Sequence, residues 1–202
     1  PEAAFYTLKD NIKLATDYLA YVISHVLDNC KTEFNFFEKW IEPEIKKTLS
    51  TVIDNNFEVI TYTEAVNALL QSGQKFEYPV AWGNDLQTEH ERYIVEKHIG
   101  KPTVVIDYPK SLKAFYMRVN DDNNTVAAMD LLVPKIGELI GGSQREERLS
   151  VLDSRMDDLG LSKEEYYWYR DLRKYGTVPH AGFGLGFERL VMYVTGMANI
   201  RD

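Results

Sequence analysis

The sequence predicts an α+β fold in which helices flank an antiparallel β-sheet. Three observations support this prediction. Apolar residues recur at helical spacing in the first half of the chain, β-branched and aromatic runs follow in the second half, and the turn-like segment "NDDNN" at 120–124 joins two of those runs. Because a short turn joins antiparallel strands, this order favours an α+β domain over a doubly wound parallel sheet.

The first half of the chain is predicted to be mainly helical. Pro43 interrupts its second helical region, since proline breaks or restarts a helix. Thr61 and Glu64 form a capping box ahead of the third helix, and Gly100 follows the fourth as a C-terminal cap. In order, we expect helices over 7–27 and 33–53, a strand over 57–61, and helices over 65–70 and 86–99.

The second half is predicted to supply most of the sheet. The runs "TVVIDYP" and "FYMRV" are typical of strands, and the second begins a hairpin that continues to residue 133. Ser162, with Glu165 three residues later, caps the last of two helices. In order, we expect strands over 103–109, 115–119 and 137–142, helices over 145–157 and 162–174, and a strand followed by a helix at 182–190.

Composition excludes several classes of protein. The chain has 202 residues, 45% of them hydrophobic, which is enough for a buried core. The single cysteine, Cys30, cannot form an internal disulfide or a cysteine-paired zinc site, and no apolar run is long enough to cross a bilayer. These features favour a cytoplasmic protein that does not bind membranes. The net charge of −8 argues against binding of nucleic acid by overall electrostatics.

The stretch "GFGLGFERL" at 182–190 carries glycine at every second position. Its spacing fits neither the dinucleotide fingerprint nor a P-loop. On a strand, Gly182, Gly184 and Gly186 would clear one face of side chains, whereas the apolar residues of 183–187 would enter the core. A planar ring could lie on the cleared face, and Arg189 could stack on it or pair with its phosphates. The alternative is a glycine strand crossed closely by another element.

Two acids and an arginine precede this stretch. Asp130 and Glu138 lie among apolar residues on neighbouring extended segments, so they need partners if they face inward. Mg²⁺ bound to nucleotide phosphates takes one or two protein carboxylates, and this pair could supply them. Arg145 could donate in a fork to a carboxylate or amide oxygen. The alternatives are two acids at a solvent-exposed sheet edge and an arginine in water at a helix start.

Together these segments resemble class II aminoacyl-tRNA synthetases. "GFGLGFERL" is similar to their third signature motif, and "GMANIRD" at 196–202 is similar to the segment after that motif in the aspartyl and asparaginyl branch. The resemblance is most specific to the asparaginyl members of that branch. It covers essentially the whole chain. The other segments that show this resemblance are "WGNDLQTEHERY" at 82–93, "SLKAFYMR" at 111–118, "GELIGGSQREER" at 137–148 and "YRDLRKYGTVPHAGFGLGFERL" at 169–190.

The resemblance implies activation of asparagine by ATP to asparaginyl-adenylate, followed by transfer to tRNA(Asn). It implies ATP and Mg²⁺ as cofactors and a homodimer in the complete enzyme. Arg189 and Glu138 would be the catalytic residues, and Arg145 would contact the side-chain oxygen of the amino acid. Asp130 and Glu138 would bind the metal. The implied ATP-binding residues are Asp130, Glu138, Gly184, Gly186, Phe187, Glu188 and Arg189. His180 would support the site, and Lys113 would lie near it.

The resemblance also implies that residues 1–202 are the C-terminal part of a catalytic domain. The family's first motif, most of its second motif and the anticodon-binding β-barrel have no counterpart in this stretch, and Pro1 and Glu2 resemble the tail of the second motif. We therefore expect the 202-residue piece to be inactive alone. Two other enzymes remain open, an aspartyl-tRNA synthetase and an ATP-dependent asparagine synthetase. A non-catalytic nucleotide-binding regulator is the alternative outside the enzymes.

Overall fold

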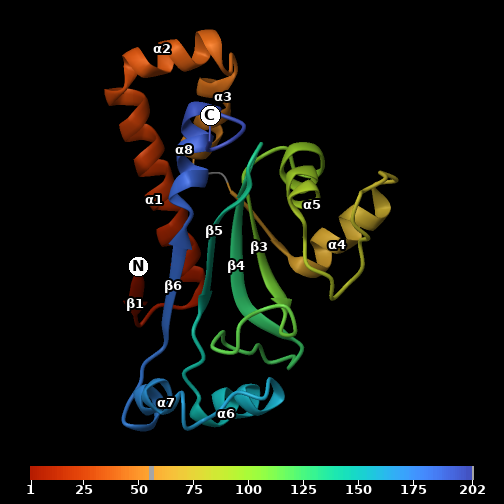
Figure 1. Ribbon diagram of the computed structural model, residues 1–202, viewed down its shortest axis with the longest axis vertical. Helices are drawn as coiled ribbons and strands as arrows, with labels where there is room; N and C mark the ends of the chain where they lie inside the picture. Colours follow the sequence, from red (N-terminus) through yellow and green to blue (C-terminus); the bar gives the residue numbers. More distant parts are fainter. Residues whose placement is uncertain (55–56, 202) are drawn as a thin grey trace.

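A six-stranded sheet forms the centre of the protein (Figure 1). The computed structural model describes residues 1–54 and 57–201, so that Asp202, the last residue of "GMANIRD", lies outside it. The strand order is β1-β6-β5-β4-β3-β2, and all neighbours pair antiparallel except β2 and β3. The strands are β1 (Glu2–Ala4), β2 (Glu58–Thr61), β3 (Thr103–Pro109), β4 (Thr125–Val133), β5 (Gly137–Gln144) and β6 (His180–Leu185). The predicted α+β class is confirmed.

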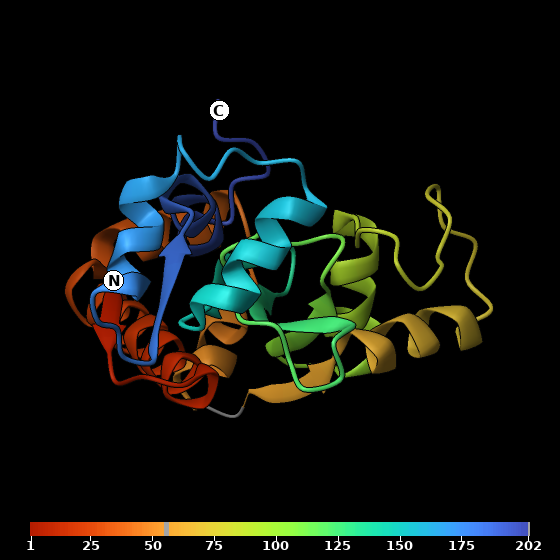
Figure 2. The same cartoon turned by 90° about the horizontal axis from the view of Figure 1, so that it is seen from below.

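Helices cover both faces and one end of this sheet. α1 packs against β4, β5 and β6, whereas α4 and α5 pack on the opposite face; α6 and α7 lie together across one end (Figures 1 and 2). The helices are α1 (Leu8–Asn29), α2 (Lys31–Trp40), α3 (Ile45–Ile53), α4 (Tyr62–Gln71), α5 (Thr88–Tyr93), α6 (Leu149–Asp158), α7 (Tyr167–Lys174) and α8 (Phe187–Thr195), with a π-helix, η1 (Ile94–His98), after α5.

Local sequence signals place several of these helix starts. Thr7 and Asp10 form a capping box at α1, and Thr61 and Glu64 form the predicted one at α4. Pro43 lies in the break between α2 and α3, as expected. Gly100 has a φ of +79° just after η1, a conformation that glycine adopts without strain. The signals at Thr61, Pro43 and Gly100 are thus confirmed, and the capping box at Thr7 is an additional one.

Two apolar cores lie on opposite faces of the sheet. The first joins α1, α3 and α8 to β4, β5 and β6, and the second joins α4, α5 and η1 to β3 and β4. Every residue of β4 is buried, because both cores meet on this strand. Over β5 and β6 the second face is not covered in the same way, and Gly184 is exposed there. That uncovered part of the sheet is where a ligand could lie.

Three sequence expectations differ from the structure. Residues 115–119 form only isolated bridges, Met117 to Arg145 and Val119 to Val126, because β3 and β5 already pair with β4 along its length. The helix expected from 145 begins at Leu149, since 144–145 still continue β5. α7 begins at Tyr167 rather than 162, although Ser162 Oγ does accept the Glu165 N–H, at 3.3 Å.

One strand, β1, was not predicted. Three residues are too few to show an alternating pattern, and β1 exists because it pairs with β6, some 180 residues later in the chain, with Glu2 opposite Gly182. Among the residues that the structure describes, no helix has the length and apolar character needed to cross a membrane.

Candidate functional site

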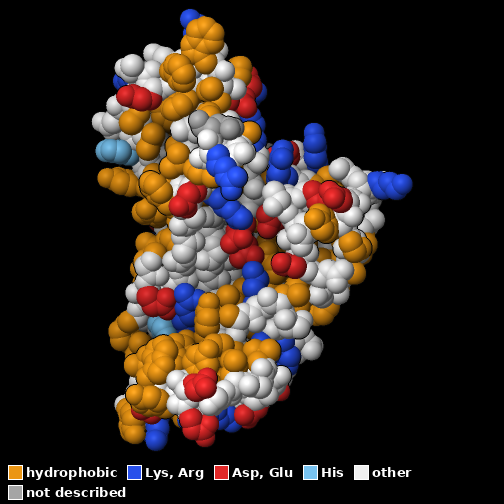
Figure 3. Space-filling model, viewed as in Figure 1, with side chains coloured by type: hydrophobic (Ala, Val, Ile, Leu, Met, Phe, Trp, Pro, Cys, Tyr) orange, Lys and Arg blue, Asp and Glu red, His pale blue; other side chains and the backbone are white. Residues whose placement is uncertain are grey.

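The uncovered face of the sheet brings the predicted acids and glycines into one row. Asp130 on β4 is paired with Gly141 on β5, and Gly141 is paired with Gly184 on β6. Directly paired residues in antiparallel strands share a face, so these three lie side by side on the same surface. Figure 3 shows acidic side chains gathered at the middle of this face, next to an area with neither charged nor hydrophobic colour.

The glycines of β6 are not equivalent. Gly184 is open, because no neighbouring atom of the described residues lies within 4 Å of the position where its Cβ would be. Gly182 is covered, since a Cβ there would overlap the Glu2 carboxylate and lie 2.5 Å from the Pro1 carbonyl oxygen. Gly186 supports Arg189, whose aliphatic carbons lie 3.5 Å or slightly more from the same position. The cleared face is therefore shorter than predicted and is centred on Gly184.

The apolar residues between these glycines divide at the end of β6. Phe183 is buried in the first core and Leu185 packs against it, as expected. Phe187 was expected in the core but is 69% exposed. It is the first residue of α8, so the strand alternation has ended before it. Glu188 is also exposed, in the first turn of the same helix.

The two predicted acids lie over the same glycine. The Cβ position of Gly141 is 2.6 Å from Glu138 Oε1 and 3.5 Å from Asp130 Oδ1, so only glycine leaves room for both carboxylates. Lys113 Nζ donates to Asp130 Oδ2 at 2.7 Å and lies 4.0 Å from the centre of the Tyr108 ring. The structure thus brings together Asp130, Glu138 and Lys113, all of which were named from the sequence.

Arg189 completes this group from the other side. Its Nη1 donates to the backbone carbonyl of Glu138 and lies 3.4 Å from Glu138 Oε2. The Arg189 side chain is half exposed, so part of it remains accessible to a ligand above Gly184. The Arg189 cation therefore reaches Glu138 on the neighbouring strand β5.

A third carboxylate, Glu91 of α5, lies behind the two predicted acids and was missed by sequence reasoning. It is 8% exposed, and its Oε2 accepts the Glu138 N–H at 3.0 Å. Burial, together with the nearby charges of Glu138 and Asp130, raises its pKa to about 7, although the hydrogen bond from the Glu138 N–H and the charge of Arg189 lower it. Burial and the charge of Asp130 likewise raise the pKa of Glu138, despite the opposing effect of Arg189.

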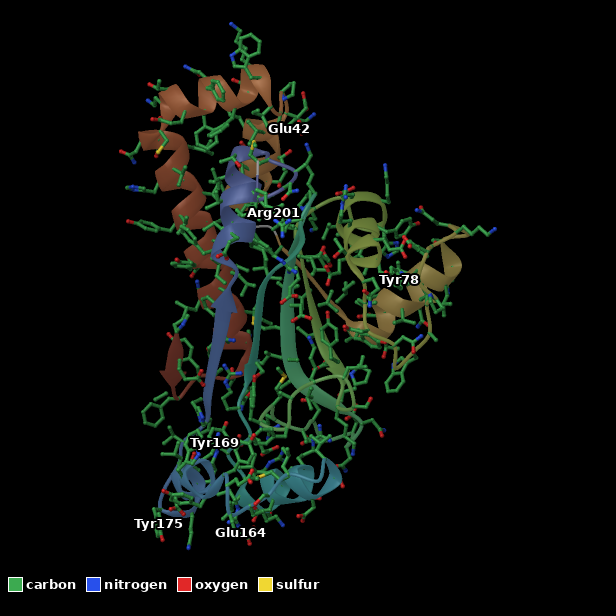
Figure 4. The ribbon with its side chains drawn as sticks, viewed as in Figure 1. Glu42, Tyr78, Glu164, Tyr169, Tyr175 and Arg201 are labelled. Atoms are coloured by element: carbon green, nitrogen blue, oxygen red, sulfur yellow. The ribbon has the colours of Figure 1, made fainter. Side chains whose placement is uncertain are left out.

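Arg145 lies at the end of β5, not at the start of a helix in water. Its Nε and Nη2 both reach the Glu2 carboxylate, at 3.0 Å, and its Nη1 donates to Ser143 Oγ at 2.6 Å. A cavity of about 480 Å³ opens beside it, and Tyr169 lies at this end of the molecule (Figure 4). The cavity is lined by Glu2, Tyr116, Arg145, Tyr169, Leu172, Arg173 and His180. Glu2 was not assigned a role from the sequence.

His180 contacts its neighbours through both ring nitrogens, as expected of a residue that supports the site. Its Nδ1 is 2.8 Å from the Val178 carbonyl oxygen, and its Nε2 is 3.5 Å from Arg173 Nη2. Arg173 is itself buried and donates to the Glu146 carbonyl oxygen at 2.9 Å. This end of the face therefore combines one accessible cation, one carboxylate and several polar rings, a set of groups suited to a small polar ligand.

Two missed residues, Glu91 and Glu2, had weak signals. Glu91 lies in "TEHERY", one acid of a charged helix, and nothing in its spacing separates it from Glu89. Glu2 precedes the first helix by six residues, and only the pairing of β1 with β6 brings it to Arg145. Both depend on contacts between distant parts of the chain, which residue spacing cannot indicate.

The carboxylate pair is compatible with a divalent cation. Within the described ranges 1–54 and 57–201, no three or more His, Cys, Asp and Glu residues are arranged to hold a metal ion. A site here would therefore use two protein carboxylates with water and phosphate oxygens as the other ligands, which is how Mg²⁺ commonly binds beside nucleotides. Burial is the main cause of the raised pKa values of Glu91 and Glu138, and the charges of the neighbouring carboxylates add to it.

Comparison with known proteins gives a consistent result over the whole chain. Asparagine–tRNA ligase of Pasteurella multocida is 62% identical over 202 residues, which is all of this chain and 43% of that protein. The chloroplastic/mitochondrial asparagine–tRNA ligase of Arabidopsis thaliana is 61% identical, with 36% of its length covered. The chain thus spans less than half the length of these curated relatives.

A solved structure matches the fold closely. Asparaginyl-tRNA synthetase from Pyrococcus horikoshii, complexed with asparaginyl-adenylate, is 39% identical with a TM-score of 0.87, and the match covers 99% of this chain and 44% of that one. The sequence model of the family described as "tRNA synthetases class II (D, K and N)" matches residues 1–202. By that match over its full length, the chain belongs to the class II tRNA synthetases of the D, K and N group.

Proposed function

We propose that residues 1–202 form part of the active site of an enzyme that activates asparagine with ATP and transfers it to tRNA(Asn). One observation carries this proposal: a single sheet face has two differently charged ends, with Asp130, Glu138 and Arg189 around open Gly184, and Arg145 with Glu2 at the other. Relatives about 60% identical are asparagine–tRNA ligases, and a solved neighbour is complexed with asparaginyl-adenylate.

The two ends suit the two substrates. At the first, we assign the adenine ring to the open surface of Gly184, with Gly186, Phe187 and Glu188 along its edge and the Arg189 guanidinium stacked on it or paired with phosphate. At the second, we assign the asparagine side chain to the cavity beside Arg145. Catalysis then rests on positioning and charge stabilisation, because phosphoryl transfer needs little covalent chemistry from the protein.

Asp130 and Glu138 are the residues that would hold magnesium. When bound, the ion would offset negative charge on the phosphates of ATP. Glu138 and Arg189 are the residues we assign to catalysis. Glu138 keeps its carboxylate over Gly141 beside Asp130, while Lys113 limits the repulsion between these acids. Arg189 holds the Glu138 backbone and leaves part of its guanidinium accessible.

Activity is proposed for a longer chain than residues 1–202. The relatives are more than twice as long, so we place this segment in the C-terminal part of a catalytic domain, with the first motif, most of the second and the anticodon-binding domain contributed by other residues. We propose that the complete enzyme is a homodimer that binds tRNA(Asn). A cytoplasmic location remains a prediction from composition.

Asparagine-dependent exchange of pyrophosphate into ATP tests the proposal. We expect the complete chain to catalyse this exchange with asparagine and not with aspartate, and residues 1–202 alone to bind ATP weakly and to catalyse no exchange. Aspartate-dependent exchange would instead indicate an aspartyl-tRNA synthetase. Formation of free asparagine from aspartate and ammonia would indicate an ATP-dependent asparagine synthetase.

A complete chain without any exchange would contradict the proposal. If that chain still bound ATP, it would favour a non-catalytic nucleotide-binding regulator. A variant substituted at Gly184 serves as the control, because the substitution should weaken ATP binding in either an enzyme or a regulator. Exchange and binding measured on the same preparation separate the two possibilities.

A further inference from the structure

The turn between β4 and β5 holds Glu138 in place and has an unusual backbone. Lys135 and Gly137 both have positive φ, at 69° and 85°. A residue other than glycine adopts this conformation at a cost, so it persists only where the surroundings determine it. The groups that determine this turn also decide where the Glu138 carboxylate lies, because Glu138 is the next residue.

Two carboxylates of the α5–η1 segment hold the turn. Glu91 Oε2 accepts the Glu138 N–H at 3.0 Å, and Glu96 Oε1 accepts the Lys135 N–H at 2.7 Å. Gly137 lies between these two contacts, and a Cβ on it would overlap the Glu91 carboxylate. The turn and the helix therefore fit together only with glycine at 137 and an acceptor at 91.

The π-helix explains how two residues five apart reach the same turn. In an α-helix such residues point about 140° apart around the axis. Here the Ile99 N–H donates to the Ile94 carbonyl oxygen at 2.8 Å, which is the i to i+5 bond of a π-turn. This wider turn begins between Glu91 and Glu96, and both carboxylates contact the β4–β5 turn.

The Glu138 backbone is thereby fixed on both sides. Glu91 accepts from its N–H, and Arg189 donates to its carbonyl oxygen. With the main chain held at both groups, the side chain extends over Gly141 next to Asp130. A shift of the turn would separate the two carboxylates, although neither Asp130 nor Lys113 had moved.

We propose that Glu91 and Glu96 are positioning residues, brought together by the π-helix, that hold the Glu138 carboxylate beside Asp130. This inference rests on the proposed function, in which those two acids bind magnesium and ATP. Glu91 acts through the Glu138 backbone rather than as a metal ligand. What it supplies is a hydrogen-bond acceptor at one position, and its negative charge is not required.

Two measurements on the complete chain test this: the affinity for magnesium in the presence of ATP, by calorimetric titration, and the magnesium dependence of the asparagine-dependent exchange reaction. Glu91→Ala should raise the apparent KM for magnesium and ATP roughly 10- to 100-fold, the usual effect of losing a group that orients a ligand. Glu91→Gln keeps an acceptor oxygen and should recover most of the wild-type KM. Glu138→Ala gives the effect of losing the carboxylate itself.

Glu89→Ala is the matched control on the same helix. The Glu89 carboxylate also accepts two backbone N–H groups, of Glu77 and Tyr78 at 3.1 and 2.8 Å, but it holds a different loop. We expect wild-type magnesium dependence from it. Glu96→Ala, at a less buried position, should raise the KM in the same direction as Glu91→Ala by a smaller factor, and it serves if Glu91→Ala does not fold.

Failure of the inference and failure of the proposed function give different results. No exchange in the wild-type chain would overturn the function. If the wild type is active and Glu138→Ala impairs it, while folded Glu91→Ala and Glu96→Ala behave like Glu89→Ala, the positioning role is wrong. If Glu91→Gln is as impaired as Glu91→Ala, the charge of Glu91 acts directly and the positioning role is again wrong.

Discussion

Two clusters of charged side chains on the same sheet shift the pKa values of their buried carboxylates in opposite directions. Glu146, just after β5, is fully buried, yet its pKa lies below the ordinary value: burial alone would raise it, but Arg148 and the Val119 N–H more than offset that effect. Glu91 is 8% exposed and its pKa is raised to about 7, because burial and the charges of Glu138 and Asp130 outweigh its hydrogen bond from the Glu138 N–H.

The two pKa shifts differ because nearby cations and N–H groups compensate the carboxylate charge to different extents, rather than because one carboxylate is more buried. Glu146 receives the Arg148 guanidinium through two nitrogens as well as two backbone N–H groups, so its charge is fully used within the protein. Around Glu138, burial and the charge of Asp130 outweigh the effects of Lys113 and Arg189, so that the pKa of Glu138 stays raised. A group of acids left in that state marks a place where a cation or another ligand can bind, whereas a compensated one is structural.

The largest expected effect is on stability at the compensated cluster. Glu146→Ala removes the acceptor of the Val119 N–H and of the partly exposed Arg148 guanidinium, and losing two hydrogen bonds to a charged group costs about 3 to 5 kcal/mol. Urea unfolding of the complete chain measures the loss. Glu164→Ala is the control, since that exposed side chain accepts from Ser162 Oγ at the surface. Equal stabilities of the two variants would remove the contrast between the clusters.

The next effect is on catalysis at the uncompensated cluster. Arg189→Ala in the complete chain should lower the rate of asparagine-dependent exchange by roughly 30- to 1000-fold, or about 2 to 4 kcal/mol, by removing a charge-assisted contact to the reacting phosphates. Arg170→Ala removes a partly exposed arginine that pairs with Asp153 at the α6–α7 end. Comparable exchange rates for the two variants would show that Arg189 does not contact the substrate.

A smaller effect is the pH dependence of stability without magnesium. The pKa of Glu91 is about 7 in the folded protein and 4.5 as its ordinary value, so between these pH values the folded state holds a proton that the unfolded state has lost. Stability should therefore fall by about 2 kcal/mol as pH rises from 5 to 8. Glu91→Gln should flatten this part of the pH profile in EDTA, and an unchanged slope would contradict the raised pKa.

The smallest stability effect is expected at Gly184. Because its Cβ position is open to 4 Å among the described residues, Gly184→Ala should change the free energy of unfolding by less than about 0.5 kcal/mol. The added methyl group should nevertheless weaken ATP binding, because it projects from the surface assigned to the adenine ring. Calorimetric titration with ATP measures this. If a folded Gly184→Ala variant binds ATP with wild-type affinity, the adenine ring does not lie on this surface.

Much of the fold could be predicted from signals between residues that are neighbours in the sequence. The rest depends on pairings between distant segments. The capping box at Thr61 and the break at Pro43 depend on neighbouring residues, so they were predictable. β1 was not predictable, because its three residues form a strand only beside β6. The run at 115–119 has strand-like composition, but β3 and β5 already occupy the edges of β4.

The candidate site shows the same division. Arg189, Asp130 and Glu138 were found because a glycine pattern and a resemblance pointed to them, and the structure places them together. Glu91 was missed because an acid in a charged helix has no distinguishing spacing, and its link to the candidate site is a hydrogen bond to residue 138. Phe187 was misplaced because the alternation of a strand was extended one residue into a helix.

The pairing of β1 with β6 also has a consequence for synthesis of the chain. Glu2 lies opposite Gly182, so β1 is translated before its partner β6, which is complete only after about 180 further residues have been added. At 5 to 20 residues per second, that delay is roughly 10 to 40 seconds. During this time β1 lacks β6 as its partner and could pair with another segment. Its length of only three residues limits that risk on the ribosome.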